Sequence, residues 1–427
     1  MQNQFQENLE FAKSMDQRDP LRDFRLRFHV KEDEIYMDGN SLGLSSKDAQ
    51  QTIKRVAEDW KNEGIRIWGM EKGKYFNYPR LIGEKLGELI GAEANEIILN
   101  GSITTNLHQA LATFYKPSES RYKILVDELN FPTDIYAVKS LIELKGYSEK
   151  DALVTVKSRD GREILEEDII EAMTEDVALV LLPSVLYRSA QLINMEQITE
   201  EAHKRGIIIG WDLAHSIGAI PHNFKKADPD FAVWCTYKYL NGGPGSVAGL
   251  YINRKHFTRE AGLKGWFGNR DDRQFRLEHQ FEQAADAGGW LQGSPHMLSI
   301  APLEGSLKIF EEAGIQKIRE KSLIITEYLM FLTEKRLIDK GYVIGNPREN
   351  HRRGGHVSLE HKEAYRISLA LRDYGVVPDY REPNVLRLAP VALYNTYEEI
   401  YRLVEILEKI SKEKIYRNYS LVRGTVL

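Results

Sequence analysis

The most informative segment of this 427-residue chain reads Trp234-Cys235-Thr236-Tyr237-Lys238-Tyr239-Leu240-Asn241-Gly242-Gly243-Pro244-Gly245. It continues an apolar run that starts at Phe231 and predicts a buried strand. The pair Tyr237-Lys238 therefore stands where that strand gives way to a glycine-rich turn. Burial lowers the pKa of a lysine amine and makes it nucleophilic, as a Schiff-base lysine requires. The alternative is a lysine that reaches from a strand end into solvent.

The segments around this strand alternate between short apolar runs and helical patterns. We expect strands at 96–99, 123–126, 152–156, 177–182, 207–212, 231–235 and 247–252. We expect helices between them at 104–115, 132–144, 164–173 and 195–204. Continuously apolar strands separated by helices predict an α/β fold whose mostly parallel sheet is covered on both faces.

The pattern changes after about residue 300. Long helices are expected at 299–312 and 315–336, followed by strands at 356–360 and 385–388 and helices at 362–374 and 396–412. We therefore predict an N-terminal segment, 1–50, that packs with the small domain, a large α/β domain, 51–305, and a small C-terminal α+β domain, 306–427.

Composition excludes several classes of function. The chain has 58 basic and 63 acidic residues, a net charge of −5, which does not fit a nucleic-acid-binding surface. The single cysteine, Cys235, excludes an intramolecular disulfide and a multi-cysteine metal site. No signal-peptide pattern is visible, and the longest apolar run, 177–182, is too short to span a bilayer. We expect a cytoplasmic protein that binds no metal, nucleic acid or membrane.

Polar residues follow several predicted strands, at the sheet edge where α/β proteins bind ligands. Residues 101–106, Gly-Ser-Ile-Thr-Thr-Asn, suit a phosphate, although a plain helix cap explains them too. Phe131 can stack on a ring, and Asp212 can pair with a protonated ring nitrogen; a capped helix start and a buried cap are the alternatives. With Lys238, these groups meet the chemical demands of pyridoxal phosphate.

The same motifs resemble those of the kynureninase family, in the aspartate-aminotransferase-like (fold type I) class. The matching segments are 39–44, 104–108, 131–134, 212–215, 237–241, 265–268, 293–295 and 387–395. This resemblance implies a pyridoxal-phosphate-dependent large domain. It also implies hydrolytic Cβ–Cγ cleavage of L-kynurenine to anthranilate and L-alanine, with 3-hydroxykynurenine as a poorer substrate.

The resemblance also implies a role for individual residues. Lys238, Asp212 and Tyr237 are the implied catalytic residues, with Tyr237 either donating a proton near the γ-carbonyl or only binding phosphate. The implied cofactor-binding residues are Ile103, Thr104, Phe131, Pro132, Thr133, Asp134, Ser184, Asp212, His215, Tyr237, Lys238, Trp266 and Ser294. Trp266 and Ser294 match positions that reach the cofactor from the other subunit, which implies a homodimer with shared sites. Arg387 and Trp68 are implied to bind the substrate, Arg387 through its α-carboxylate.

Some positions depart from the family pattern. The segment 64–68 lacks the usual Asp-Gly before Trp68, and Ser294 replaces the usual threonine, so the pocket for the aryl ring is in doubt. Members that prefer the hydroxylated ring have asparagine at the position of Ser294. A related hydrolase of a modified aryl-kynurenine is therefore an alternative. A cysteine desulfurase or aminotransferase-type enzyme is a more distant alternative. A desulfurase needs a reactive cysteine on a mobile loop, whereas Cys235 is predicted to lie inside a strand.

Overall fold

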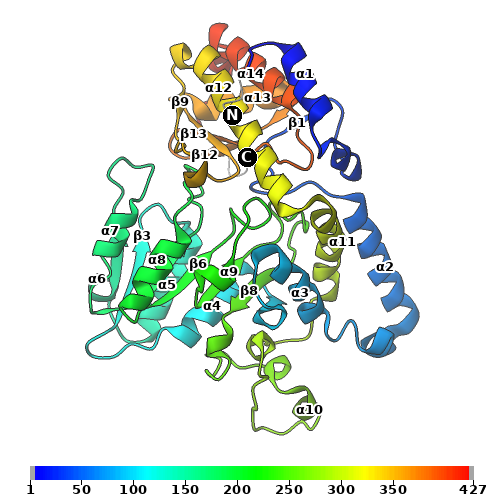
Figure 1. The fold of residues 1–427 in the computed structure, drawn as a ribbon, viewed down its shortest axis with the longest axis vertical. Helices are drawn as coiled ribbons and strands as arrows, with labels where there is room; N and C mark the ends of the chain where they lie inside the picture. The colour runs from blue at the N-terminus through cyan, green and yellow to red at the C-terminus, as the bar shows by residue number, and fades with distance from the viewer. Residues whose placement is uncertain (1–4, 423–427) are drawn as a thin grey trace.

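A computed structural model describes residues 5–422, whose centre is a seven-stranded sheet in the order β2-β8-β7-β6-β5-β3-β4 (Figure 1). Its strands are β2 (Ile97–Asn100), β3 (Lys123–Asp127), β4 (Leu153–Val156), β5 (Val177–Pro183), β6 (Ile208–Asp212), β7 (Phe231–Trp234) and β8 (Ala248–Ile252). Neighbours from β7 to β4 are parallel, which confirms the predicted mostly parallel sheet. Only β8 runs antiparallel to its neighbours β2 and β7. The connection from β7 to β8 contains the lysine turn but no helix, so the chain returns in the opposite direction.

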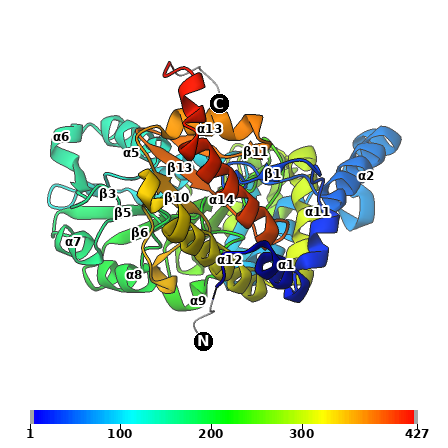
Figure 2. The same ribbon diagram turned by 90° about the horizontal axis from the view of Figure 1, so that it is seen from above.

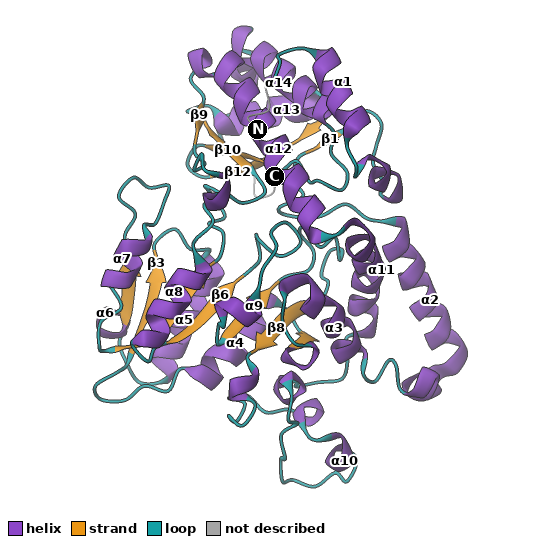
Figure 3. Cartoon of the chain, in the orientation of Figure 1, coloured by secondary structure: helices purple, strands orange, loops and turns teal. Residues whose placement is uncertain are grey.

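Helices cover both faces of this sheet (Figure 3). One face packs against α3 (Tyr78–Ile90), α7 (Glu166–Glu171), α8 (Met195–Lys204) and α9 (Phe224–Ala227). The other packs against α4 (Ile103–Phe114), α5 (Pro132–Leu144) and α6 (Glu149–Ala152). Along β5, Leu179 and Leu181 belong to one core and Val180 and Leu182 to the other. Burial of both faces explains the continuously apolar strands.

A second sheet lies above the first in Figure 1, in the order β12-β13-β10-β9, with antiparallel neighbours. Its strands are β9 (Val343–Ile344), β10 (Val357–Glu360), β12 (Asp379–Arg381) and β13 (Val385–Leu388). It packs with α12 (Ile315–Arg336), α13 (Ala364–Asp373) and α14 (Tyr397–Lys412), in a core separate from those of the large sheet. The register sets Asp379 opposite Arg387.

The N-terminal residues contact this smaller unit. Helix α1 (Leu9–Arg18) packs on α14, and β1 (Ile35–Tyr36) pairs with β11 (Val376–Val377). The chain then enters α2 (Lys47–Glu63), which packs along α11 (Met297–Ala313) at one side of the molecule (Figure 2). The short α10 (Asp271–Gln274) projects below the large sheet in Figure 1.

Short 3-10 helices fill many connections. They are η1 (Arg22–Arg27), η2 (Gly64–Lys72), η3 (Ala94–Glu96), η4 (Arg254–His256), η5 (Trp266–Gly268), η6 (Ala287–Trp290), η7 (Ile338–Lys340), η8 (Asn350–Arg352) and η9 (Ile415–Asn418). No helix within residues 5–422 is both long and apolar enough to cross a membrane.

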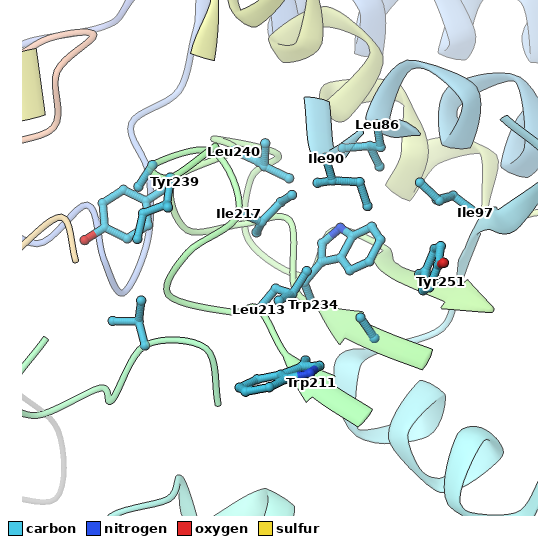
Figure 4. Close-up of a cluster of buried hydrophobic side chains, with 14 of the residues drawn as sticks. Leu86, Ile90, Ile97, Trp211, Leu213, Ile217, Trp234, Tyr239, Leu240 and Tyr251 are labelled. Carbon is cyan, nitrogen blue, oxygen red and sulfur yellow. The ribbon is translucent and has the colours of Figure 1, made fainter. Parts of the chain in front are cut away.

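Apolar packing anchors the turn that carries Lys238. Leu240, two residues later, is fully buried. Figure 4 shows it in a cluster with Leu86, Ile90, Ile97, Trp211, Leu213, Ile217, Trp234, Tyr239 and Tyr251. These residues come from β2, β6, β7, β8, α3 and the turns that follow the strands, so the lysine turn is fixed to the large-sheet core.

Candidate functional site

A cavity of about 220 Å³ opens at the carboxyl ends of the parallel strands. It is lined by Asn40, Ser41, Ile103, Thr104, Phe131, Thr133, Asp134, Asp212, Ala214, His215, Cys235, Tyr237, Lys238, Arg381 and Arg387. The large sheet, the smaller sheet and the N-terminal segment each contribute residues to it. The structure therefore brings most of the predicted site residues together.

Lys238 enters the cavity from the turn after β7. Its Nζ lies 3.0 Å from Nε2 of His215 and 5.9 Å from the ring centroid of Phe131. Burial lowers the pKa of His215 well below its usual value, and the positive charge of Lys238 adds to this shift. The neutral imidazole can therefore accept a hydrogen bond from the lysine amine at Nε2. Its Nδ1 then carries the proton, and that buried atom has no partner among the described residues.

Two buried carboxylates line the cavity beside the lysine. Asp212 ends β6, and its Oδ1 accepts a hydrogen bond of 2.6 Å from the backbone N–H of Ala214. Burial raises the pKa of Asp212, and Lys238 opposes this shift. Burial, and then the negative charge of Asp212, raise the pKa of Asp134 well above its usual value. A cationic ring nitrogen would stabilise an ionised Asp212, since no ion pair to it is found within residues 5–422.

The start of α4 forms another wall of the cavity. Ser102 caps this helix by accepting a hydrogen bond of 3.2 Å from the N–H of Thr105. Ile103 and Thr104 occupy its first turn, where backbone N–H groups have no partner inside the helix. These N–H groups and the Thr104 hydroxyl can bind an anion such as a phosphate.

Arg387 reaches the opposite side of the cavity from β13. Its Nε donates to Asp379, its Nη1 to the carbonyl of Tyr187 (2.8 Å) and its Nη2 to Ser41 (3.1 Å). Nη2 also forms the ion pair with Asp379, so of the five guanidinium N–H donors only one, on Nη1, is without a partner among the described residues. This N–H can donate to an oxygen of a carboxylate.

Comparison with known proteins gives the family. The chain is 54% identical over 418 residues to a kynureninase of Geobacillus thermodenitrificans (strain NG80-2), across 98% of both chains. It is 55% identical over 422 residues to a kynureninase of Bacillus anthracis, across 99% of both. The chain belongs to the kynureninase family. A family model described as the kynureninase C-terminal domain also matches residues 318–407.

Solved structures show the same fold at low sequence identity. A cysteine desulfurase from Thermococcus onnurineus NA1, in its apo form, superposes with a TM-score of 0.78 at 18% identity, over 92% of this chain and 98% of that one. A mutant of C-DES with glycine covalently linked to its PLP cofactor superposes with a TM-score of 0.79 at 15% identity, over 90% of this chain and 99% of that one. The predicted fold class, kynureninase activity and pyridoxal phosphate cofactor are confirmed by the family and this fold.

The cavity of this kynureninase fits that cofactor. It contains a lysine, a ring-sized aromatic side chain, the open end of a helix and a carboxylate, that of Asp212, which forms no ion pair with any residue in 5–422. The residues that would hold the group are Lys238, Phe131, Asp212, Ile103 and Thr104. Among the described residues, no group of three or more His, Cys, Asp or Glu could hold a metal ion.

Five predicted kynureninase site residues do not line the cavity of this single chain. Ser184 is buried behind it, where its hydroxyl donates to the Asp212 carbonyl (3.1 Å), and Pro132 is the first residue of α5. Trp68 lies in η2 and packs edge-on against Phe76, 6.4 Å between ring centroids. Trp266 in η5 is 44% exposed, and its indole N–H donates to the Gln274 carbonyl (2.7 Å); Ser294 is also exposed. Their roles stay predictions.

Sequence reasoning assigned no role to Asn40, Ser41 and Arg381, which also line the kynureninase cavity. Asn40 and Ser41 lie in the matching segment 39–44, so the motif was the available signal. No sequence motif pointed to Arg381, because its position depends on the pairing of β12 with β13. Cys235 was expected inside the strand, but β7 ends at Trp234 and Cys235 lines the cavity. Burial raises the pKa of its thiol, which disfavours the thiolate that a desulfurase needs.

Proposed function

We propose that Lys238, Asp212 and Arg387 carry out kynurenine hydrolysis in this cavity. The observation that supports this proposal is their convergence on one space from the end of β6, the turn after β7 and strand β13. The bound cofactor supplies an electron-accepting ring that stabilises negative charge on the substrate carbon next to the amine. The residues of the chain bind the substrate, move its protons and keep the cofactor ring able to accept electrons.

Arg387 binds the α-carboxylate of the substrate through its positive charge and its remaining donor on Nη1. Asp379 orients the guanidinium from the neighbouring strand. Lys238 removes the proton from the α-carbon, and His215, 3.0 Å from its Nζ, accepts a hydrogen bond from the amine and so orients it. Asp212 keeps a proton on the ring nitrogen, which increases the electron demand of the ring.

Water then adds to the γ-carbonyl, and the Cβ–Cγ bond breaks. The electron pair stays on Cβ, which takes up a proton to give L-alanine, and the hydrated carbonyl carbon leaves as the carboxylate of anthranilate. Tyr237 lines the cavity, and burial raises the pKa of its phenol, so it is a proton donor at neutral pH. We assign it protonation near the γ-carbonyl; a role in phosphate binding alone is equally compatible with its position.

Covalent labelling tests the central assignment. Borohydride reduction of the holoenzyme should fix the cofactor on Lys238, and peptide mapping identifies the labelled residue. Lys238→Ala should lose nearly all anthranilate formation, followed by fluorescence, while it still binds the cofactor non-covalently. A label on another lysine would refute the assignment.

We further propose a homodimer in which Trp266 and Ser294 complete the partner's site. Trp266 is 44% exposed, and Phe275, which packs edge-on against it, is 66% exposed. Leu277, two residues further along the chain, is 72% exposed. An interface would cover this projecting apolar region, which lies away from the cavity of its own chain. The predicted cytoplasmic location stays a proposal from the sequence.

A further inference from the structure

Asn40 is a buried amide whose side chain has no hydrogen-bond partner in the described part of the chain. Its side chain has 0% exposure, and neither Oδ1 nor Nδ2 forms a hydrogen bond to any described residue. A side-chain amide has two N–H donors and a carbonyl acceptor, and leaving them unpaired away from water is costly. Asn40 lines the same cavity as Lys238 and Arg387, so a ligand there can supply the missing partner.

The backbone around Asn40 is fixed to both sides of the site. The N–H groups of Ser41 and Leu42 donate to the Asp38 carbonyl (3.0 and 3.1 Å), and Asp38 pairs with Ala389 just after β13. Gly43 donates to the carbonyl of Tyr237 (2.7 Å), next to the lysine. Asn40 is therefore held between β13, which carries Arg387, and the turn that carries Lys238.

The two arginines that line the cavity with Asn40, Arg381 and Arg387, already have partners. The Ser41 hydroxyl accepts from Arg387 Nη2 (3.1 Å) and Arg381 Nη2 (3.4 Å). Asp379 Oδ2 accepts from Nε of both arginines. The amide of Asn40 takes no part in this network, and Oδ1 of Asp38 and Oδ1 of Asp379 also have no partner among the described residues. Asn40 and Arg387 line the same cavity, and Arg387 keeps one free donor there, on Nη1.

We propose that Asn40 is a substrate-binding residue that donates a hydrogen bond from Nδ2 to the carboxylate of the amino-acid end, beside Arg387. The inference rests on the proposed function of Arg387. A neutral donor adds selectivity for a carboxylate without adding charge to a cavity that already holds Arg381, Arg387 and Lys238. Its position, one residue before Ser41, directs it to the amino-acid end of the substrate and away from the aryl ring.

The two products separate the two ends of the substrate. L-Alanine carries only the amino-acid end and anthranilate only the aryl end, so their dissociation constants are measured with the holoenzyme by equilibrium titration. Asn40→Ala should weaken L-alanine binding about tenfold to a hundredfold, the effect of one hydrogen bond to a charged group. Anthranilate binding should stay within about twofold. Unchanged alanine affinity, or an equal loss for anthranilate, overturns the proposal.

Stability distinguishes this role from a structural one. The Asn40 amide makes no hydrogen bond in the described structure, so Asn40→Ala should unfold at the temperature of the wild type when no product is present. Asn253→Ala is the matched control. This asparagine is 5% exposed at the opposite edge of the large sheet, and its Nδ2 donates to Asp228 and Pro229. The control should lose stability and keep its alanine affinity; a loss of stability only in Asn40→Ala contradicts a ligand role.

Two further variants complete the test. Asn40→Asp keeps the shape but places a negative charge beside the carboxylate, so it should bind L-alanine more weakly than Asn40→Ala does. Wild-type affinity in Asn40→Asp would overturn the proposal. Arg387→Lys tests the proposed function separately: if it leaves alanine affinity unchanged, the role of Arg387 fails, whatever Asn40→Ala shows.

Discussion

Asp212 shows how burial and charge act together on one carboxylate. It is 6% exposed and faces the cavity, where burial raises its pKa and the Lys238 charge opposes that shift. A cationic ring nitrogen would restore the ionised form. Asp212→Asn keeps the shape but removes the charge, so we expect turnover to fall about a hundredfold or more while some cofactor still binds. Anthranilate fluorescence measures turnover, and wild-type activity in this variant would contradict the role.

Asp127, at the end of β3, gives a stability prediction. It is fully buried, its Oδ2 has no partner among the described residues, and burial raises its pKa to about 7. The folded protein therefore binds a proton that the unfolded chain loses near pH 4, so its free energy of unfolding falls as pH rises from about 4 to 7. Asp127→Asn should remove this loss and be more stable than the wild type by about 2–4 kcal/mol at pH 8.

Denaturant unfolding of the holoenzyme at pH 5 and pH 8 measures this effect. The advantage of the variant should grow from the lower to the higher pH. A constant difference across both values would mean that Asp127 does not titrate in this range.

Ser294 carries the prediction on substrate choice. It is one methyl smaller than the usual threonine, and one methyl changes discrimination by only about 1–3 kcal/mol. We expect kcat/KM to favour kynurenine over 3-hydroxykynurenine, by less than with threonine. Ser294→Asn should shift the ratio toward the hydroxylated substrate, because its amide can bond the extra hydroxyl. Equal values for the two substrates in the unmodified enzyme would show that this pocket was misinterpreted.

At the scale of elements, local signals made some boundaries predictable. Helices α5 and α8 and strand β13 have the expected bounds. Pro132 begins α5, and Asn194 caps α8 with a hydrogen bond of 3.2 Å from the N–H of Gln197. The antiparallel direction of β8 could not be predicted, because it depends on the path of the lysine turn. The side chains that contact Arg387 could not be predicted from the sequence either, because the register of β12 and β13 sets Asp379 opposite it.

Dependence on long-range contacts also explains why some site residues could not be predicted from the sequence. Residues that follow the strands of one sheet, such as Asp212 and Lys238, share an edge by topology, so the sequence alone groups them. Asn40 comes from the N-terminal segment, and its place depends on contacts with both sheets. Trp68 and Trp266 were assigned by the family pattern alone, and a single chain does not bring them to the cavity.

The close contact between segment 38–44 and the lysine turn is testable at Gly43. A Cβ on Gly43 would clash with the Lys238 carbonyl and the Asn241 side chain. Gly43→Ala should therefore displace the lysine turn, lower kcat at least tenfold and destabilise the fold by about 1–3 kcal/mol. Gly69→Ala is the control, because nothing lies within 4 Å of its added Cβ. Steady-state kinetics and thermal unfolding measure both variants; full activity in Gly43→Ala would show that the turn tolerates the shift.

At the scale of the whole molecule, Trp266 and Ser294, two of the predicted site residues, lie outside the cavity of their own chain. Trp266 is exposed, and α10 beside it projects away from the large sheet (Figure 1). In a twofold dimer every contact occurs twice, so an interface that places this region over the cavity of one partner does so for both subunits. The proposed shared sites therefore make activity depend on two different subunits.

Subunit mixing tests that dependence. Lys238→Ala and Trp266→Ala should each be nearly inactive, but their heterodimer holds one site with an intact Lys238 from one subunit and an intact Trp266 from the other. Random exchange should restore up to about a quarter of wild-type activity. Lys238→Ala mixed with Asp212→Asn is the control, since both residues serve the site of their own subunit and no intact site can form. Failure to regain activity after verified exchange, while Trp266→Ala alone is crippled, would place Trp266 in the site of its own chain and remove the argument for shared sites.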